Sequence, residues 1–428
     1  RGLEPILYLN KKGEFKKSSI DLDYNLRYPM GATSADFTGN GCLDLFIYQV
    51  GSSSSLVYSE VLDLRENKSK RSGVDHHGGN VMFKNECNSS SPSFTYRTFE
   101  RGRNSHAASA IDLNDDGRID IHVANDFVQD SIYLNKDEGK FEIEDMGANS
   151  RRHGMSSSIG DINGDQRPDI FVTNINLGQV DLSPERCLSE ILSLPSTKCL
   201  FKIGQDRFRK FFRMEGNNLF VNKGSLEFKD LGAEKGVDLG GWGWSSSMAD
   251  FTNNGHLDII HGTSGRPRIE SGYRTIASDS NWDEFNSDLL KIQFWEGNDS
   301  DFTKIDSDRT GFDIGNQKGL ARLDVERDGC LDIVTGGKSS NEIFKVYDNV
   351  GCNKSKYLQV RIRGEGANII GSKIVLKTNK RNLTRFLNSR SNFLSQSSRM
   401  LHFGLKSNET ARALKIDYTD GGLKSYEI

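Results

Sequence analysis

The sequence predicts an all-β protein: a β-propeller of five to seven four-stranded blades, followed by a small C-terminal β-domain. Three features of the 428 residues lead to this prediction. An acidic nine-residue loop recurs five times, a strand of small residues precedes each loop, and apolar strands follow it. Repeated four-stranded units with small side chains on the innermost strand, where strands crowd a central axis, are typical of propeller blades.

The five loops, called loops 1 to 5, each begin and end with aspartate. They occupy residues 36–44, 112–120, 161–169, 250–258 and 324–332. Oxygen-bearing side chains recur at positions 1, 3, 5 and 9, and position 6 is glycine except for Gln166 in loop 3. The candidate ligands are Asp36, Thr38, Asn40, Asp44, Asp112, Asn114, Asp116, Asp120, Asp161, Asn163, Asp165, Asp169, Asp250, Thr252, Asn254, Asp258, Asp324, Glu326, Asp328 and Asp332.

Oxygen-only ligand sets of this kind suit a hard cation, and Ca²⁺ fits better than Mg²⁺ because it tolerates flexible geometry with roughly six to eight oxygens. We therefore expect several structural Ca²⁺ ions. Loops 2, 3 and 5 carry more carboxylates than loops 1 and 4, so we rank them as the stronger sites. The alternative is that these are ordinary turns, which Asp, Asn and Gly also form.

The strand before each loop carries small residues on one face. Three positions before the first aspartate stand Thr33, Ser109, Ser158, Ser247 and Ala321, and five positions before it stand Gly31, Ala107, Ser156, Ser245 and Gly319. Small side chains at alternate positions indicate that another part of the chain packs closely there. A hairpin expected over residues 6–16 has the sequence of two outer strands without a loop before it, so we interpret it as the outer half of a blade that closes the ring.

Composition excludes some classes of function. The net charge of −3 gives no general attraction to nucleic acid or membranes. No stretch approaches the roughly 20 apolar residues of a membrane span. The absence of an initiator methionine and of a signal-like apolar run suggests that Arg1 begins a processed or trimmed fragment. The length suits two domains or one large β assembly.

The six cysteines predict disulfides and an oxidising compartment. Cys42 and Cys330 follow the glycine of their loops, and Cys87 and Cys352 follow matching strand ends. Equivalent positions predict the pairs Cys42–Cys87 and Cys330–Cys352, which leaves Cys187–Cys199; buried free thiols are the alternative. Six glycosylation sequons agree with secretion, at Asn67, Asn88, Asn298, Asn353, Asn382 and Asn408.

Several motifs resemble a known family. The loops look like FG-GAP/VCBS repeats, and Val123-Ala-Asn-Asp-Phe followed by Tyr133-Leu-Asn is similar to blades of the cartilage acidic protein family. Asn368-Ile-Ile-Gly, Leu401-His-Phe-Gly-Leu and Tyr418-Thr-Asp-Gly resemble the ASPIC/UnbV domain that caps such propellers. Tyr418 and Thr419 stand where that family usually has Trp and Pro. The resemblance implies a secreted calcium-binding scaffold rather than a catalyst, with a propeller over residues 1–353 and an ASPIC/UnbV-like domain over 354–428.

In a propeller, the connections opposite the acidic loops lie on one face. That face receives the insertions 50–79, 174–217 and 262–291. Its candidate ligand-binding residues are Arg27, Tyr28, His106, Arg151, Arg152, His153, Trp242 and Trp244. Basic, amide and aromatic groups suit an acidic or carbohydrate partner, whereas the two tryptophans could instead fill the axis and the histidines could be structural.

The sequence thus favours a secreted adhesion or recognition module with an extracellular protein or glycan as partner, and with calcium in a structural role. It contains no Gly-x-Ser-x-Gly elbow and no His-Glu-x-x-His motif, and no catalytic residue can be named. Two alternatives remain: an extracellular propeller enzyme, of the glycan hydrolase or lyase type, that uses the insertion face, and a structural subunit of an extracellular assembly. The oligomeric state is left open.

Overall fold

The structure is a computed structural model of the 428-residue chain. It describes residues 6–17, 24, 26, 28–50, 79–87, 93–99, 103–126, 128–146, 150, 153–174, 216–263, 291–299, 301–313, 317–337, 344–352, 356–363, 367, 369–389 and 392–428. Within these residues the protein is all-β, and its one helix is the single turn α4 (Ser307–Thr310). No helix of the described chain is long and apolar enough to cross a membrane.

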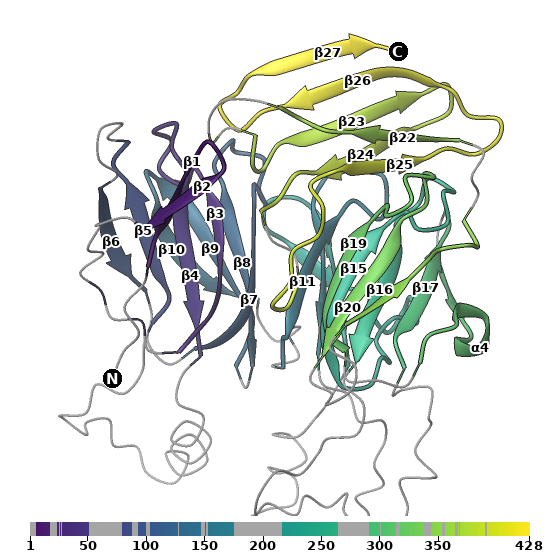
Figure 1. The fold of residues 1–428 in the computed structure, drawn as a ribbon, viewed down its shortest axis with the longest axis horizontal. Coiled ribbons are helices and arrows are strands. Elements are labelled where there is room, and N and C mark those ends of the chain that lie inside the picture. Colours follow the sequence, from purple (N-terminus) through teal and green to yellow (C-terminus); the bar gives the residue numbers. More distant parts are fainter. Residues whose placement is uncertain are drawn as a thin grey trace, which may run out of the picture.

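Five antiparallel sheets stand side by side, and a sixth lies across one end of them (Figure 1). Each of the five begins with the small-residue strand that precedes an acidic loop. Sheet 1 contains β3 (Pro29–Ala35), β4 (Asp44–Gln49), β5 (Val81–Asn85) and β6 (Phe94–Thr98). Sheet 2 contains β7 (Asn104–Ile111), β8 (Asp120–Asp126), β9 (Ser131–Asp137) and β10 (Lys140–Asp145).

Sheets 3 and 4 repeat this arrangement, whereas sheet 5 has three described strands. Sheet 3 contains β11 (Ser156–Gly160), β12 (Asp169–Thr173), β13 (Asn218–Asn222) and β14 (Phe228–Asp230). Sheet 4 contains β15 (Gly243–Ala249), β16 (Asp258–Thr263), β17 (Gln293–Gly297) and β18 (Phe302–Ile305). Sheet 5 contains β19 (Gln317–Leu323), β20 (Asp332–Gly337) and β21 (Phe344–Tyr347).

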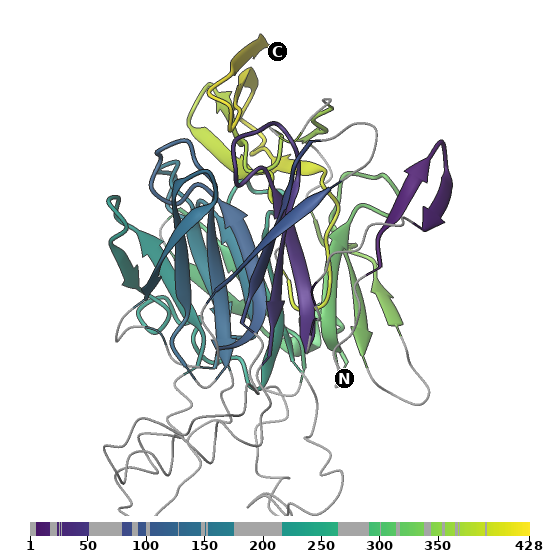
Figure 2. The same cartoon turned by 90° about the vertical axis from the view of Figure 1, so that its left-hand side faces the viewer.

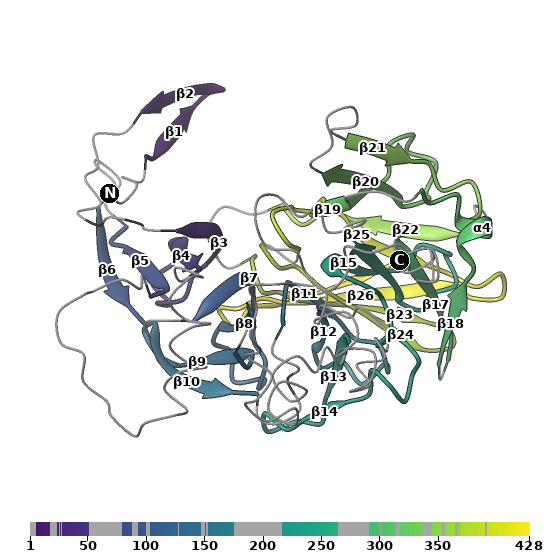
Figure 3. The same ribbon diagram turned by 90° about the horizontal axis from the view of Figure 1, so that it is seen from below.

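The sheets form an arc in chain order. The innermost strands contact one another as β3 with β7, β7 with β11, β11 with β15 and β15 with β19. Figure 3 shows these strands towards the middle and the outer strands at the periphery. A separate hydrophobic core fills each space between neighbouring sheets. The residue at position 2 of the loop belongs to it: Phe37, Leu113 and Phe251 are buried, but Val325 of the last sheet is 45% exposed.

The C-terminal domain combines a four-stranded sheet with a strand pair. The sheet has the order β24 (Asn382–Phe386), β23 (Lys373–Thr378), β26 (Ala411–Asp417) and β27 (Leu423–Glu427). The pair is β22 (Tyr357–Val360) with β25 (Leu401–Gly404). Its own core includes Ile374, Leu376 and Phe403. It covers the end of the arc that carries the acidic loops.

The N-terminal hairpin stands apart from the arc (Figure 2). Strands β1 (Tyr8–Lys11) and β2 (Glu14–Lys17) pair with each other and, among the described strands, with no other. Lys12 and Gly13 both adopt positive φ, as a two-residue type I′ turn requires. The hairpin has the predicted outer-strand sequence, but the inner half of its blade is not among the described strands.

Candidate metal-binding loops

The five acidic loops share one hydrogen-bond scheme. In each, the position 1 carboxylate accepts the backbone N–H groups of positions 5 and 6, at 2.7 to 3.2 Å. The position 5 side chain accepts the N–H of position 7 at 2.7 to 3.0 Å. Position 6 has positive φ in every loop, including Gln166 at 68°, as expected for the sharp turn. The scheme holds the oxygens of positions 1 and 5 close together.

The closing aspartate ties its loop to the third strand of the same sheet. Asp44, Asp120, Asp169, Asp258 and Asp332 are each 0–1% exposed. One of their oxygens accepts a backbone N–H from position 2 or 3 of the loop, at 2.7 to 3.0 Å. The other accepts an N–H at the end of the third strand, at 2.8 to 2.9 Å. Position 9 therefore has a structural role besides any contribution to a metal site.

Burial raises the pKa of Asp44, Asp120, Asp169 and Asp258. Desolvation raises the pKa of Asp120 to about 7 and that of Asp169 to about 8, against the lowering effect of their backbone hydrogen bonds. Burial also raises the pKa of Asp258 well above its usual value, with the Asp250 carboxylate as the next cause. A bound cation would reverse this shift, because an opposite charge favours the ionised form. Oxygen donors that share a buried site in this way fit a hard cation.

The loops differ in how their charge is already balanced. In loops 2 and 3, the position 5 carboxylates of Asp116 and Asp165 pair with Arg118 and Arg167. In loop 4, the Asp250 carboxylate also accepts the N–H of Gly404 at 2.7 Å and lies 3.6 Å from Arg385. Loop 4 has only two carboxylates of its own. Arg385 therefore already supplies to Asp250 the positive charge that a bound cation would otherwise provide.

Loop 5 gains a carboxylate that sequence reasoning missed. Oxygens of Glu326, Asp332 and Asp348 all lie within 4.8 Å of one another. Asp348 stands just before Asn349 at the end of the third strand, and sheets 1 to 3 have Lys84, Leu134 and Val221 at that place. The acidic residue directly before this recurring asparagine was the feature of the sequence that could have identified Asp348 as a further candidate ligand.

That recurring asparagine links neighbouring sheets. Asn135 donates its side-chain amide to the carbonyl of Phe37 in loop 1, at 2.8 Å. Asn222 makes the same bond to Leu113 in loop 2 at 2.9 Å. Asn349 makes it to Phe251 in loop 4 at 2.7 Å. Each loop concerned is therefore fixed both by its own sheet and by the next one.

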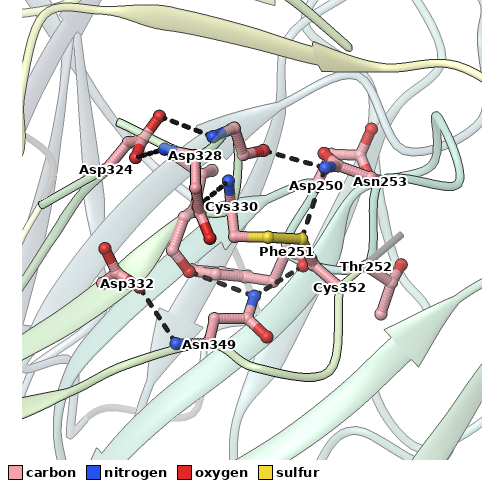
Figure 4. The surroundings of a disulfide bond; sticks show 12 residues. Asp250, Phe251, Thr252, Asn253, Asp324, Asp328, Cys330, Asp332, Asn349 and Cys352 are labelled. Atoms are coloured by element: carbon pink, nitrogen blue, oxygen red, sulfur yellow. Dashed lines mark hydrogen bonds between the residues drawn. A yellow bond between two sulfur atoms is a disulfide. The ribbon is translucent and has the colours of Figure 1, made fainter. Parts of the chain in front are cut away.

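Two of the predicted disulfides are confirmed. Cys42–Cys87 and Cys330–Cys352 join loops 1 and 5 to the ends of their third strands, with Cα–Cα distances of 5.8 and 5.9 Å. Figure 4 shows the second bond beside the Asp324, Asp328 and Asp332 side chains. Cys187 and Cys199 lie outside the described residues.

A segment of the C-terminal domain fills the middle of the arc. We call residues 387–389 and 392–401 the plug, and it reaches down between the sheets in Figures 1 and 2. Ser389 hydrogen-bonds to Thr33 of sheet 1. Asn392 lies 3.5 Å from Ser158 of sheet 3 and donates to the Leu320 carbonyl of sheet 5 at 2.7 Å. The small residues of the inner strands therefore make room for this segment.

The candidate ligand-binding residues of the insertion face fall into three groups. Arg27, Arg151 and Arg152 lie outside the described residues, and Tyr28 is 50% exposed. His153 Nδ1 lies 3.0 Å from Asp126 Oδ1, and His106 Nε2 lies 3.9 Å from Asp126 Oδ2. The rings of Trp242 and Trp244 are nearly parallel, with centroids 6.4 Å apart.

The plug closes the centre beside these aromatic residues. Phe393 packs against Trp244 and His106, with ring centroids 5.0 and 5.9 Å away. Lys318 Nζ lies 4.0 Å from the centre of the Trp244 ring. The register of the inner strands shifts at His106, Trp244 and Lys318. A shift of this kind is a β-bulge, and a bulge changes the direction of the side chain at that position. Trp244 thus helps to fill the middle, together with a phenylalanine that sequence reasoning did not place there.

Two family models match the chain. Residues 112–172 match the FG-GAP-like repeat, and residues 363–427 match the ASPIC and UnbV domain. The chain therefore contains an FG-GAP-like repeat and a C-terminal ASPIC/UnbV domain, which confirms the architecture that the sequence motifs indicated. Comparison with curated protein sequences gave no match.

Similar solved structures include the biofilm matrix protein Bap1 of V. cholerae, at 10% identity and a TM-score of 0.36, covering 94% of this chain and 59% of Bap1. The exotype rhamnogalacturonan lyase YesX has 11% identity and a TM-score of 0.37, with 98% and 72% covered. Rhamnogalacturonan lyase YesW has 13% identity and a TM-score of 0.29, with 72% and 59% covered. This chain thus spans 59% of the length of Bap1. Scores this low support no functional assignment.

Proposed function

We propose that the protein is an extracellular calcium-binding β-propeller that serves as an adhesion or recognition module for a protein or glycan. In this proposal the five sheets are blades, and Ca²⁺ bound in the acidic loops is structural. The observation that carries it is the common loop scheme, in which the same backbone hydrogen bonds hold the position 1 carboxylate at five equivalent places. The two disulfides support an oxidising compartment.

The residues differ in how well they suit the ion. Loops 2 and 3 would hold it through the side chains of Asp112 and Asp116, and of Asp161 and Asp165. Loop 5 would add Glu326 and Asp348. The bound ion would supply positive charge and fix the loop.

Calorimetry tests the metal. Metal bound only by the folded state raises stability by about 2.7 kcal/mol per site at a free concentration of about 100 Kd. We expect EDTA to lower the melting temperature by several degrees and added Ca²⁺ to restore it. Asp116→Asn and Asp165→Asn should each weaken one site in isothermal titration, whereas Asp137→Asn, an exposed aspartate outside the loops, should leave binding unchanged. Identical melting with Ca²⁺ and with EDTA would contradict the proposal.

An array of glycans and extracellular proteins, screened with and without Ca²⁺, tests the recognition role. One observation favours the enzyme alternative, namely that His106 and His153 converge on Asp126. Phe393 in the centre opposes it, because it occupies the place of a deep axial pocket. Turnover of a polysaccharide that is lost in His153→Ala, with the calcium-dependent melting unchanged, would favour the enzyme.

A further inference from the structure

A small polar recess lies between sheet 5 and the plug. Its volume is about 20 Å³, and it is lined by Arg322 of β19, by Phe386 and by residues from both halves of the plug. The lining also includes a second arginine, Arg399, together with Asn388, Ser389, Gln396 and Ser398. None of the ten lining residues is acidic. The recess is therefore electropositive.

Arg322 differs from the other partly buried arginines of this region in how its charge is balanced. Arg381 pairs with Glu409 at 2.7 Å, and Arg385 lies 3.6 Å from Asp250. Arg322 donates to the Ser247 hydroxyl at 2.9 Å, and no carboxylate of the described residues forms an ion pair with it. Removing a cation from water without a counter-charge is costly. An arginine in this state, among the lining residues of a recess without acidic groups, points to an anion as its counter-charge.

The size of the recess decides what kind of anion fits. A volume of about 20 Å³ holds one or two water-sized groups, so it accommodates one or two oxygens of an oxyanion group but not a sugar ring. The rest of a ligand would pass Arg399, Gln396 and Ser398, which are exposed at the mouth. Guanidinium groups bind carboxylate, sulfate and phosphate through paired N–H donors, and the serine hydroxyls can donate to the same oxygens.

We propose that this recess is a binding site for one oxyanion group, either a free anion or the carboxylate, sulfate or phosphate at the end of a larger ligand. The site lies where the plug meets the last sheet, since Arg322 N donates to Ser397 Oγ at 3.2 Å and Arg322 O accepts the Ser398 N–H at 3.2 Å. A bound anion would therefore also hold the C-terminal domain to the arc. The site is separate from the acidic loops and does not depend on calcium.

Isothermal titration with sodium acetate, sodium sulfate and sodium phosphate, at an ionic strength held constant with chloride, tests the site. We expect one saturable site for at least one of these anions. A preference for acetate points to a carboxylate ligand, and a preference for sulfate or phosphate points to an ester. Repeating the acetate and sulfate titrations with Ca²⁺ should give the same anion affinity. The anion site can therefore be shown even if the acidic loops do not bind calcium.

Two variants and a control make the test specific. Loss of one charge-assisted contact should weaken binding by about tenfold or more in Arg399→Gln and in Arg322→Gln. Arg412→Gln removes an exposed arginine of β26 and should bind like the wild type. Because Arg399 is exposed, its variant should fold even if Arg322→Gln does not. Heats that never saturate, or equal affinities in folded Arg399→Gln and wild type, would overturn the proposal.

Discussion

The backbone N–H of Gly404 donates a 2.7 Å hydrogen bond to the buried carboxylate of Asp250, which joins the C-terminal domain directly to loop 4. Loop 5 is held in a similar way, because Gln359 of β22 donates to Asp324 at 2.8 Å. His402 also donates to the side-chain oxygen of Asn253 in loop 4. The opening aspartates of both loops therefore respond to the position of the C-terminal domain.

Gly404→Ala should loosen this junction. A Cβ at Gly404 would lie 2.5 Å from Asp250 Oδ2 and 2.5 Å from the carbonyl carbon of Asn253, so the loop or the domain must shift. Overpacking of this kind costs about 1 to 3 kcal/mol. Chemical denaturation should show a lower midpoint. Gly351→Ala is the matched control, since the nearest atom would be 3.9 Å away, and its midpoint should match that of the wild type.

Arg385→Met should leave Asp250 without its nearest positive charge. Removing one partner of a buried pair destabilises by about 3 to 5 kcal/mol, and the 3.6 Å separation here places the effect at the lower end. Urea denaturation in EDTA measures it. The double variant Arg385→Met/Asp250→Asn should recover part of the loss, because the uncompensated charge is gone. No recovery in the double variant would show that Arg385 acts through packing instead.

Asn135→Asp should weaken the link between sheets 1 and 2. The amide of Asn135 donates to the carbonyls of Phe37 and Ile119, at 2.8 and 3.2 Å, and the residue is 1% exposed. A carboxylate in its place cannot donate, and leaving buried groups unsatisfied costs about 1 to 3 kcal/mol. Thermal melting checks the change.

Asn10→Asp provides the control for this variant. Asn10 stands in the same Leu-Asn-Lys motif but is exposed, and its side-chain oxygen accepts the Gly13 N–H, which a carboxylate also does. Its melting temperature should equal that of the wild type. If both variants melt alike, the asparagine link carries no stability.

The loops, their turns and two disulfides could be predicted because they are local and repeated. Five copies show which positions are fixed, so the positive φ at Gln166 follows from the glycines elsewhere. Cys42 and Cys330 occupy equivalent places in two copies, which identified their partners. In both cases the prediction came from comparing equivalent positions in several copies of the repeat, and one copy alone would not have been enough.

The plug could not be predicted, because its contacts join segments far apart in the chain. Phe393 packs against His106 of sheet 2 and Trp244 of sheet 4, and nothing in the local sequence of residues 387–401 indicates these distant partners. The small inner residues did indicate a close neighbour, but not its identity. Asn135 was likewise read only as part of a strand, since its partner Phe37 belongs to another sheet.

The last prediction concerns pH. Burial lowers the pKa of His261 to about 3, and Lys304 adds to the effect. Because this folded-state pKa lies below the unfolded value of about 6.5, the neutral ring contributes stability above pH ~6.5 that is lost as the pH falls towards 3. His261 is fully buried, and its Nδ1 accepts the Asn217 amide at 2.9 Å. His261→Gln keeps an acceptor but cannot ionise, so the decline of unfolding free energy between pH 6 and 4 should be shallower by about 1.4 kcal/mol per pH unit. Urea denaturation across that range measures the slope, and a variant slope equal to the wild-type slope would show that His261 does not titrate on unfolding.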